Sequence, residues 1–561
     1  MKILPAHGAD LFVRNLETLG LEVIFGIPGS HDTYLYNSLR KSSIRTVLAT
    51  SELHAAFMAN GYYRNSGKTA ALLAIAGPGF TNAITGLTEA FFDSAGMVCI
   101  ICKPDKLPGS KFQLQKIDEK AMVKTVTKSC LSVAAVSDIA AALPACFELA
   151  SKGEPGPVLL EVSPGMLGRK GDFTKSEEPA APQAAPAIDD TAIEEVLRFI
   201  RSSRRAVLYL GQGAAAAAHR IAELAELLQA PVLTTTSGRG ILPESHPLSL
   251  PSDLVDDVGL VNSILASSDC VLALGCKFTH NGAKGFRLEI PEDRLIHVDA
   301  SPEVPGANYP ARLTVTADAD LFLDALFRER DSLQQRDTGW ESEEIEQQRQ
   351  ALIKSRHKRT FPEPQFRGMN PPTASAFFSS LRHVLPEETV LVTDSGLHQM
   401  LARKYFDVTV PRGLIVPADY QSMGFGIPAG IGARLANQER HTVVITGDGG
   451  FALCGMELST AVREKIDMTV ILFNDNSMGL IRIHQLNRTG HSHAVKTGRI
   501  DYAGFCESLG IHYSKLDNDI HDTVEKSLAG GGVSLIEVVL EDTLDISKAS
   551  AKGLIRNILK I

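Results

Sequence analysis

The sequence predicts an α/β protein with three consecutive doubly wound parallel-sheet domains. Short runs of β-branched and aliphatic residues alternate with helix-length segments along the 561-residue chain, which is typical of parallel sheets with right-handed crossovers. Two polar, proline-containing stretches, 170–190 and 329–371, divide this alternation into three blocks. We therefore expect domains at 1–168, 190–330 and 370–550. The second stretch is expected to hold an exposed helix followed by an extended connection.

Each block has its own series of strands and helices. In the first block we expect strands at Glu22–Phe25, Arg45–Ala49, Ala70–Ile75 and Met97–Cys102, with helices at Ser30–Leu39, Glu52–Arg64 and Thr81–Phe92. In the middle block we expect strands at Ala206–Leu210, Val232–Thr235, Cys270–Leu274 and Leu295–Val298, and a helix at Ala214–Leu228. In the third block we expect strands at Val390–Thr393, Thr442–Ile445, Met468–Phe473 and Ser534–Val539, and a helix at Met456–Glu464.

Composition and charge exclude several classes of function. The chain has 56 Lys+Arg against 65 Asp+Glu, a net charge of −9, so a basic face for nucleic acid is not expected. No apolar run reaches the roughly 18–20 residues of a membrane span, and polar residues at His7–Asp10 interrupt any signal-peptide core. The eight cysteines are scattered, mostly in apolar strands, which indicates reduced core thiols in a cytoplasmic protein.

The third block contains the most informative motif. Gly447, Asp448, Gly449 and Gly450 follow a buried strand and precede a helix, where free backbone N–H groups can face an anion. The next strand ends in Asn474–Ser477. Because neighbouring parallel strands end at the same edge of a sheet, Asp448 and the Asp475 region are expected to lie close together. Oxygen ligands beside a diphosphate are suited to Mg²⁺.

This pairing of GDG with an asparagine-rich strand end about 25 residues later resembles the motif of thiamine-diphosphate-dependent enzymes, in the group of acetolactate synthase, benzoylformate decarboxylase and pyruvate decarboxylase. The resemblance covers nearly the whole chain and implies a pyrimidine-binding domain, a middle Rossmann-like domain and a diphosphate-binding domain. It implies Asp448, Asp475 and Ser477 as metal ligands. Asp475 departs from the usual second asparagine, which keeps an oxygen ligand and adds a negative charge.

A second motif lies in the first block. Glu52 lies where an expected strand ends and an expected helix begins. One explanation of a carboxylate at this position is its favourable interaction with the helix dipole. However, Glu52 lies nine residues before Gly61 of an Ala-x-Gly-Tyr segment, as the family's glutamate does. The resemblance then implies that Glu52 hydrogen-bonds the ring nitrogen N1′ of the cofactor's aminopyrimidine and thereby promotes loss of the thiazolium C2 proton.

Two further segments, Thr393–Gln399 and Gln421–Pro428, resemble cofactor-binding stretches of the family. In Gln421–Pro428, Met423 would wedge between the two cofactor rings, and the Gln421 carbonyl would accept a hydrogen bond from the 4′-amino group. The alternative is that Met423 only fills space in the core. The implied cofactor-binding residues are Ser395, Gly396, Leu397, His398, Gln421, Met423, Gly447, Gly449, Gly450, Ser477 and Met478.

The sequence leaves the fate of the decarboxylated substrate open. Ile75 stands where the benzoylformate decarboxylase pattern has a histidine, and Gln115 would be a neutral donor over the reacting carbon. Few proton donors favour a carboligase, which joins a 2-oxo acid such as pyruvate to a second carbonyl. The alternatives are a non-oxidative decarboxylase that releases an aldehyde and a catalytically inactive binding homologue. Gln113 is the alternative to Gln115.

Other substrate-pocket residues are chosen by the same resemblance. His484 falls where acetolactate synthases carry a tryptophan, and with Arg482 it would make a polar or cationic pocket; both residues can equally be solvated helix positions. Ser30 and His31 are implied as catalytic groups, with His31 as a proton shuttle. The implied pocket also includes Pro28, Gly29 and Phe112.

The resemblance also bears on cofactors and assembly. Gly211-Gln212-Gly213 resembles a dinucleotide turn, but most side chains that would match a flavin site are missing, so FAD is possible and less expected than thiamine diphosphate with Mg²⁺. Active sites shared between chains imply a homodimer or a homotetramer, and the apolar residues of Thr81–Phe92, which are Ile84, Leu87, Ala90 and Phe91, are candidates for the interface.

Overall fold

The structure is a computed structural model, and it describes residues 6–105, 110–171, 188–252, 257–358, 363–517 and 520–541. The chain forms two compact units. Unit 1 holds the chain up to Ala185 together with Tyr420–Glu439 and Cys454–Asp467. Unit 2 holds Pro186–Asp419, Arg440–Leu453 and the chain from Met468 onward.

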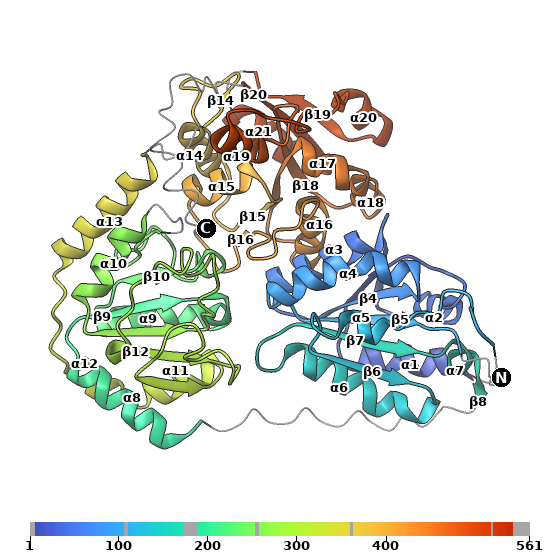
Figure 1. The fold of residues 1–561 in the computed structure, drawn as a ribbon, viewed down its shortest axis with the longest axis horizontal. Coiled ribbons are helices and arrows are strands. Elements are labelled where there is room, and N and C mark those ends of the chain that lie inside the picture. Colours follow the sequence, from blue (N-terminus) through green and yellow to red (C-terminus); the bar gives the residue numbers. More distant parts are fainter. Residues whose placement is uncertain are drawn as a thin grey trace. The chain divides into compact units, whose positions relative to one another are not determined.

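Unit 1 is built on a six-stranded sheet in which every neighbouring pair is parallel. Its strand order is β3 (Arg45–Leu48), β2 (Val23–Gly26), β4 (Ala70–Ile75), β5 (Met97–Cys102), β7 (Pro157–Val162) and β6 (Ser129–Val133). The antiparallel pair β1 (Ala6–His7) and β8 (Lys170–Gly171) lies apart from it. Figure 1 shows helices α3 and α4 on one face of this sheet and α1 and α6 on the other.

The helices of unit 1 include three from the third block. From the first block they are α1 (Gly8–Thr18), α2 (Thr33–Leu39), α3 (Glu52–Ser66), α4 (Pro78–Phe92), α5 (Glu119–Val123), α6 (Ile139–Ser151) and α7 (Pro164–Gly168). From the third block they are α16 (Gly426–Ala436), the 3₁₀ turn η6 (Gly455–Glu457) and α18 (Leu458–Arg463).

Helices α3 and α16 are in unusually close contact. A Cβ atom added at Gly61 would overlap the backbone of Ala429, and one added at Gly432 would overlap the backbone of Met58. Phe57 and Phe425 meet edge to face beside this contact, with ring centroids 5.3 Å apart. The Ala-x-Gly-Tyr segment therefore serves packing, because only glycine lets the two helix backbones touch.

Unit 2 contains two sheets. The middle domain has the all-parallel order β10 (Val232–Thr234), β9 (Ala206–Leu210), β11 (Cys270–Leu274), β12 (Leu295–Asp299) and β13 (Leu313–Thr316). Its helices are α8 (Asp190–Ser202), α9 (Ala218–Leu228), α10 (Val258–Ser267), α11 (Ala319–Phe327), α12 (Arg330–Gln334) and α13 (Ser342–Arg356).

The third domain has the order β14 (Gln365–Phe366), β20 (Val533–Glu541), β18 (Met468–Asn474), β17 (Thr442–Gly447), β15 (Val390–Thr393) and β16 (Leu414–Ile415), with β19 (His512–Lys515) beside β20. Only the β14–β20 pair is antiparallel. Its unit 2 helices are α14 (Ala374–Val384), α15 (Leu397–Tyr405), α17 (Asp448–Cys454), α19 (Gly479–Thr489), α20 (Tyr502–Leu509) and α21 (Ile520–Gly530).

The predicted fold class is confirmed, because each block forms its own largely parallel sheet. Some element limits differ. Helix α2 starts at Thr33 rather than Ser30, and α17 starts at Asp448, so Gly449 and Gly450 lie in the first helical turn rather than in a turn before it. The expected linkers fall partly outside the described residues, at 172–187 and 359–362.

The helix expected after the middle domain is present as α13, and it is exposed on one face only. Helix α13 buries Ile345 and Leu352 in the middle-domain core, and Figure 1 shows it running beside that domain. Trp340 is also buried there: its Nε1 donates to the Ala206 carbonyl at 2.9 Å, and Arg205 stacks 3.8 Å from its ring centroid. Burial of these apolar side chains makes the segment a part of the middle domain.

Four backbone N–H groups of the turn after β9 already donate hydrogen bonds within the chain. The N–H of Gly211 donates to Leu274, and that of Gly213 donates to Gly275, while Ala214 and Ala215 donate back into the turn itself. A dinucleotide turn needs such N–H groups for a pyrophosphate. The structure therefore does not support the resemblance of this turn to a dinucleotide-binding site.

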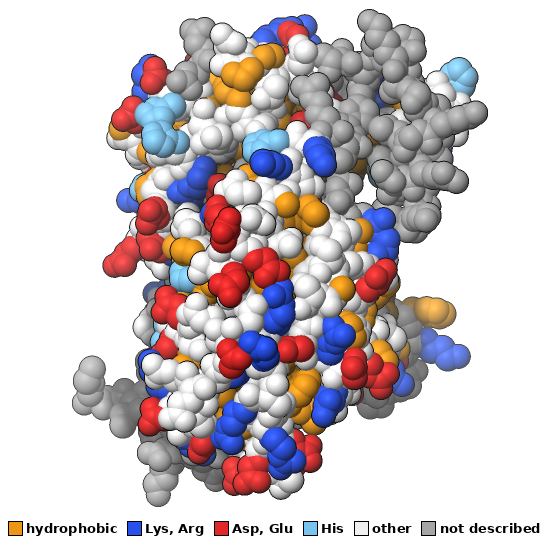
Figure 2. Space-filling model, turned by 90° about the vertical axis from the view of Figure 1, so that its left-hand side faces the viewer, with side chains coloured by type: hydrophobic (Ala, Val, Ile, Leu, Met, Phe, Trp, Pro, Cys, Tyr) orange, Lys and Arg blue, Asp and Glu red, His pale blue; other side chains and the backbone are white. Residues whose placement is uncertain are grey.

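The surface agrees with the balanced composition. On the face drawn in Figure 2, acidic and basic side chains are interspersed without a large field of one sign. Among the described residues, no helix combines the length and the apolar character that crossing a membrane would require. All eight cysteines are free thiols, and seven of them are buried.

We expect Gly61→Ala to destabilise the protein, by about 1–3 kcal/mol or more, because the new methyl group overlaps the α16 backbone. Gly259→Ala is the matched control: Gly259 lies near the start of α10 with open space around its Cβ position, so alanine should be neutral or stabilising by up to about 1 kcal/mol. Chemical denaturation measures both. Equal stability of the two variants would contradict the close α3–α16 contact.

Candidate active site

Four strands of unit 1 deliver the predicted catalytic residues to one edge of its sheet. Because β3, β2, β4 and β5 are adjacent and parallel, the segments that follow them begin side by side. These segments carry Glu52, Gly29–Asp32, Gly77–Gly79 and the stretch that contains Gln115. The carboxyl edge of a parallel sheet is where α/β proteins commonly bind ligands.

Glu52 is the first residue of α3 and is 8% exposed. The Ser51 hydroxyl caps this helix by accepting the Leu53 N–H at 3.3 Å. Asn82 of α4 donates from Nδ2 to Glu52 Oε2 at 3.1 Å. An ideal Cβ on Gly79 would lie 3.0 Å from Glu52 Oε1, so the carboxyl packs against the first turn of α4. The side chain is thus held between two helices with one oxygen hydrogen-bonded.

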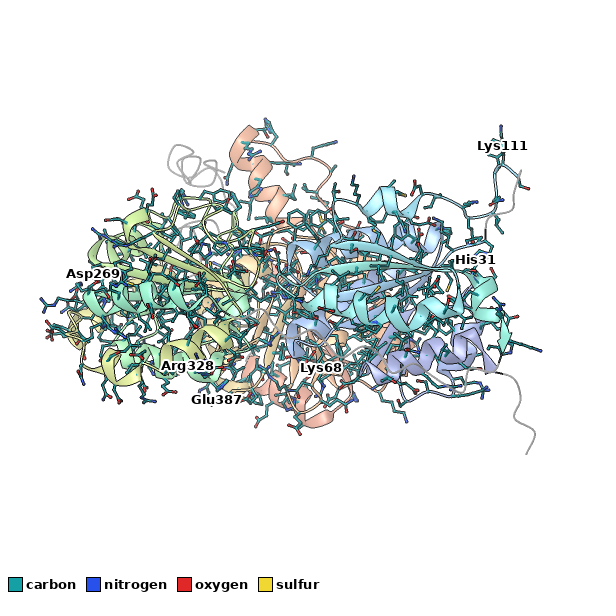
Figure 3. The ribbon with its side chains drawn as sticks, turned by 90° about the horizontal axis from the view of Figure 1, so that it is seen from below. His31, Lys68, Lys111, Asp269, Arg328 and Glu387 are labelled. Carbon is teal, nitrogen blue, oxygen red and sulfur yellow. The ribbon has the colours of Figure 1, made fainter. Side chains whose placement is uncertain are left out.

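The Gly29–Asp32 segment packs against the end of β4. A Cβ on Gly29 would meet Ile75, while the Gly29 N–H donates to Asp32 Oδ1 at 2.8 Å. Asp32 is fully buried, and burial raises its pKa to about 6. His31, labelled in Figure 3, has a buried Nδ1 without a hydrogen-bond partner among the described residues. Ser30 and Pro28 are exposed.

The structure distinguishes the two candidate glutamines. The Cβ position of Gly77 lies 3.0 Å from Gln115 Cβ, and Gln115 Oε1 is buried with no partner among the described residues. Gln113 instead accepts a hydrogen bond from Lys116 Nζ at 2.5 Å. Phe112 is fully exposed, so the chain by itself does not bring Phe112 into a pocket.

A buried hydrogen-bond network lies beside Glu52. Glu457 of η6 is fully buried and accepts the Thr50 N–H at 3.1 Å, and His54 Nδ1 lies 2.8 Å from its Oε2. The Thr460 hydroxyl donates to its Oε1 at 2.7 Å. Burial raises the pKa of Glu457, but these hydrogen bonds outweigh it and leave the pKa below its ordinary value. The network fixes the connection between β3 and α3.

The segment before α16 completes this half of the site. Gln421 has a left-handed φ of +62°, which is rare for a residue other than glycine, and Gly424 has φ +79°. Met423 is half-buried. The Ser422 N–H donates to Glu89 Oε2 of α4 at 2.8 Å. The segment therefore has a defined, strained backbone rather than an extended one.

A second cluster of candidate residues lies in unit 2, where β17 and β18 end side by side. Asp448 opens α17 and is 4% exposed, and burial raises its pKa. Burial and the nearby Asp448 charge raise the pKa of Asp475 to about 6. A buried and a half-buried carboxyl that repel one another are stabilised by a shared cation. The sequence-based expectation that these two strand ends meet is confirmed.

Neighbouring side chains hold these carboxyls in place. Thr497 Oγ1 donates to Asp448 Oδ2 at 2.6 Å, and the Ser477 N–H donates to Asp475 Oδ1 at 3.0 Å. The Asn474 amide donates to Glu537 Oε1 at 2.7 Å, so Asn474 orients the loop rather than facing a ligand. Ser477 Oγ is buried without a partner among the described residues.

The end of β15 adds a buried histidine to the same edge. His398 lies in the first turn of α15, and burial lowers its pKa to about 4, so the ring is neutral. Its Nε2 has no partner among the described residues. A Cβ on Gly396 or Gly447 would come within 2.8 Å or 3.1 Å of this ring. Leu397 is a core residue, so only its backbone can face a ligand.

Helix α19 carries the two predicted pocket residues. Arg482 and His484 are both partly buried, as is Met478 just before the helix. The Arg482 charge lowers the pKa of Asp475 and so partly offsets the repulsion from Asp448. Burial and nearby Arg488 lower the pKa of His484, so His484 is neutral and the positive charges near these residues are those of Arg482 and Arg488.

The residues present fit a divalent cation with a diphosphate. Asp448 and Asp475 supply the oxygen donors that Mg²⁺ prefers. Three groups can donate hydrogen bonds to anionic oxygens without adding a positive side chain. They are the Ser477 hydroxyl and His398 Nε2, both buried without a partner among the described residues, and the N-terminus of α15. Such groups lose free energy when buried without a partner, so a bound anion would satisfy them.

Sequence reasoning missed several residues of the site. Asn82 and Asp32 lie within the two segments used for the resemblance, so their positions were visible although their roles were not. Glu457, Glu89 and Thr497 carry no motif of their own. Their contacts come from parts of the chain far away in sequence, and only the fold reveals them.

Comparison with known sequence families gives three matches in the expected order. The thiamine pyrophosphate enzyme N-terminal TPP binding domain matches residues 6–122, the central domain matches 193–326, and the C-terminal TPP binding domain matches 394–538. Each range falls inside one of the three expected domains, whose limits remain predictions.

Individual relatives match along almost the whole chain. The acetolactate synthase isozyme 1 large subunit of Escherichia coli (strain K12) is 29% identical over 540 residues, which is 95% of this chain and 94% of the relative. The probable acetolactate synthase large subunit of Methanocaldococcus jannaschii is 27% identical over 573 residues, with coverage of 99% and 95%. Acetolactate synthase 1, chloroplastic, of Zea mays is 29% identical over 565 residues, with coverage of 96% and 86%.

We expect Thr497→Val to weaken divalent-cation binding about tenfold, because the Asp448 carboxyl loses the hydroxyl that orients it. A titration with Mn²⁺ in the presence of inorganic diphosphate, followed by electron paramagnetic resonance, measures this affinity. Thr497→Ser keeps the hydroxyl and should bind like the unaltered protein. Unchanged or tighter binding by Thr497→Val would contradict the positioning of Asp448 by Thr497.

Proposed function

The chain belongs to the thiamine pyrophosphate-dependent enzymes and is acetolactate synthase-like within them, and we propose that it joins a decarboxylated 2-oxo acid to a second carbonyl compound. The observation that carries the proposal is that each unit has its own cluster of the expected residues: Glu52 with its Asn82 partner in unit 1, and Asp448 with Asp475 in unit 2. Thiamine diphosphate, when bound, supplies the carbon nucleophile and electron sink that make loss of CO₂ from a 2-oxo acid feasible.

In unit 1 we assign the proton-handling roles. The Glu52 carboxyl holds the proton shared with the cofactor's ring nitrogen, and Asn82 orients that carboxyl. The Gln421 carbonyl and the Met423 side chain bind the aminopyrimidine end. Gln115 donates a hydrogen bond to the substrate oxygen; its buried position against Gly77 favours it over Gln113. His31, with its orphaned Nδ1, is the proposed proton shuttle beside Ser30.

In unit 2 we assign the diphosphate and metal roles. Asp448, Asp475 and the Ser477 backbone hold Mg²⁺, and the proposed diphosphate donors come from the starts of α15 and α17 and from Met478. These donors are Ser395, Gly396, Leu397, His398, Gly447, Gly449 and Gly450. The mutual repulsion of the two carboxyls supports the metal assignment, and the buried donors without partners among the described residues support the anion assignment.

The proposed reaction balances without an external oxidant or reductant. The bond between the keto carbon and the carboxylate breaks and releases CO₂, and its electron pair forms the new carbon–carbon bond. The oxygen of the second carbonyl then takes up one proton. Arg482 supports an anionic acceptor, because it brings a positive charge close to Asp475. Pro28, Gly29 and the neutral His484 are proposed to contact the substrate without adding charge.

The runner-up function is a non-oxidative 2-oxo-acid decarboxylase, in which the carbon nucleophile takes a proton and leaves as an aldehyde. The buried acid Asp32 favours this alternative, because burial raises its pKa to about 6 and brings the carboxyl closer to the range of a general acid, and the His31 ring beside it in sequence has a buried Nδ1 without a partner among the described residues. The neutral Gln115 and the full-length likeness to acetolactate synthases favour ligation.

We propose that the enzyme works in the cytoplasm, since its eight thiols are free and seven are buried. Thiamine diphosphate and Mg²⁺ are the proposed cofactors. The N–H groups of Gly211 and Gly213 already donate within the chain and so do not face a pyrophosphate, which argues against FAD at this turn. The visible absorption spectrum of the purified protein tests this point, because bound flavin is yellow.

We propose that the minimal active assembly is a homodimer, with pairing of dimers into a tetramer as a further step. Phe92 of α4 and Tyr420 are 42% and 43% exposed and stack with ring centroids 5.3 Å apart, which forms an apolar patch that a second copy can cover. The sequence suggested Leu87 and Ala90 as interface residues. Both are fully buried within the chain, so they do not contribute to a surface that a second copy could contact.

We expect pyruvate, supplied with a panel of aldehydes and 2-oxo acids, to give CO₂ and a hydroxyketone or hydroxy-keto acid. Product analysis by mass spectrometry and nuclear magnetic resonance measures this outcome. Gln115→Glu is expected to shift products toward the aldehyde, since an acid replaces a neutral donor at the reacting carbon. Release of acetaldehyde as the only product, with every acceptor tested, would contradict the carboligase proposal and favour the decarboxylase.

We expect mixed dimers of Glu52→Gln and Asp448→Ala proteins to regain activity that neither variant has alone. If the two halves of one site come from different chains, each mixed dimer carries one unaltered site. Subunit exchange is followed by mass spectrometry and activity by CO₂ release. Demonstrated exchange with activity still at background would show that each chain builds its site alone.

A further inference from the structure

The peptide that joins Gln421 to Ser422 sets the direction of the Gln421 carbonyl. A flip of this peptide rotates ψ of Gln421 and φ of Ser422, so it turns the Gln421 carbonyl and the Ser422 N–H around together. It leaves the left-handed φ of Gln421, +62°, unchanged. The direction of the carbonyl therefore depends on what holds the Ser422 N–H.

Glu89 of α4 supplies that hold. Its side chain is fully buried, and Oε2 accepts the Ser422 N–H at 2.8 Å. In a trans peptide the N–H and the C=O point in opposite directions. The hydrogen bond to Glu89 therefore also fixes the direction of the Gln421 carbonyl, which faces away from Glu89.

The same helix holds a second group of the site. Asn82 lies seven residues, or about two helical turns, before Glu89, so both side chains project from similar faces of α4. Asn82 donates to Glu52 Oε2, while Glu89 accepts from Ser422. Helix α4 thus fixes the spacing between the Glu52 carboxyl and the Gln421 carbonyl, the two groups proposed to contact the aminopyrimidine.

We infer that Glu89 is a positioning residue that prevents the Gln421–Ser422 peptide from flipping and so fixes the direction in which the Gln421 carbonyl meets the 4′-amino group of the cofactor. This inference rests on the proposed function and deepens it, since it identifies what aligns the aminopyrimidine. Glu89 touches neither substrate nor cofactor; it acts through the backbone of Ser422.

The protonation state of Glu89 guides the choice of variants. Burial and the neighbouring Asp93 raise the pKa of Glu89 to about 8, against the opposing hydrogen bonds from Ser422 and the charge of Arg64. At neutral pH the side chain is therefore largely an uncharged acceptor. Glutamine matches it in shape and charge and keeps the carbonyl oxygen, whereas leucine matches its approximate size and removes the acceptor.

The test compares Glu89→Gln with Glu89→Leu in the full-length enzyme. Two quantities are measured with thiamine diphosphate and Mg²⁺: the dissociation constant by calorimetry, and the rate at which the cofactor's thiazolium C2 proton exchanges with deuterium after rapid quenching. We expect Glu89→Leu to slow this exchange by about tenfold or more while the dissociation constant changes by less than about threefold. Glu89→Gln should exchange like the unaltered enzyme.

Other outcomes overturn the inference. Normal exchange in Glu89→Leu means that the peptide does not depend on Glu89. Equal slowing in both variants means that a carboxyl, rather than an acceptor for Ser422, is needed. An affinity loss as large as the exchange loss means a general structural role. If Glu89→Leu does not fold, Glu89→Asp, which withdraws the carboxyl by one methylene, replaces it under the same criteria.

The proposed function can fail separately. If the unaltered protein does not bind thiamine diphosphate, the proposed function is wrong and the inference about the peptide falls with it. If the unaltered protein binds the cofactor and exchanges the C2 proton while Glu89→Leu does the same, only the inference is wrong.

Discussion

The close contact between α3 and α16 is the constraint on which the unit 1 half of the site depends. Helix α3 begins with Glu52, and the segment just before α16 contains Gln421 and Met423, so the distance between the helices sets the distance between these groups. Glycine at positions 61 and 432 lets the two backbones touch. A larger residue at either position would move a whole helix, because helices behave as rigid bodies in a densely packed interior.

Buried acids are used in different ways within this framework. Glu457 is paired with donors from three residues, so its pKa stays below the ordinary value and its charge is retained. Glu89 lies near Asp93 and has its pKa raised to about 8, so it accepts a backbone hydrogen bond as a neutral acid. The number of donors around each carboxyl decides which state is stable. One network fixes a connection, and the other fixes a single peptide plane.

Much of the architecture could be predicted from the sequence, because strand and helix periodicity is a local property. The strands at Ala70–Ile75, Met97–Cys102 and Cys270–Leu274 match the predictions residue for residue. The meeting of Asp448 with Asp475 followed from parallel-strand geometry. The packing of one face of α13 against the middle domain and the contacts of Glu457, Glu89 and Thr497 could not be predicted, since each depends on a partner distant in sequence. Periodicity also failed to reveal that Gly449 and Gly450 lie inside a helix.

The Asp475 carboxyl has a consequence for how unit 2 depends on its cation. Where an asparagine would be neutral, Asp475 places a second acid beside Asp448, and burial together with that neighbour raises its pKa to about 6. Above that pH the empty site holds two charges that repel, and Arg482 compensates only in part. Repulsion of this kind destabilises the folded state without a cation and adds to the free energy gained when one binds. The cation therefore contributes to the stability of the β17–β18 edge as well as to ligand binding, and the substitution of acid for amide strengthens that coupling.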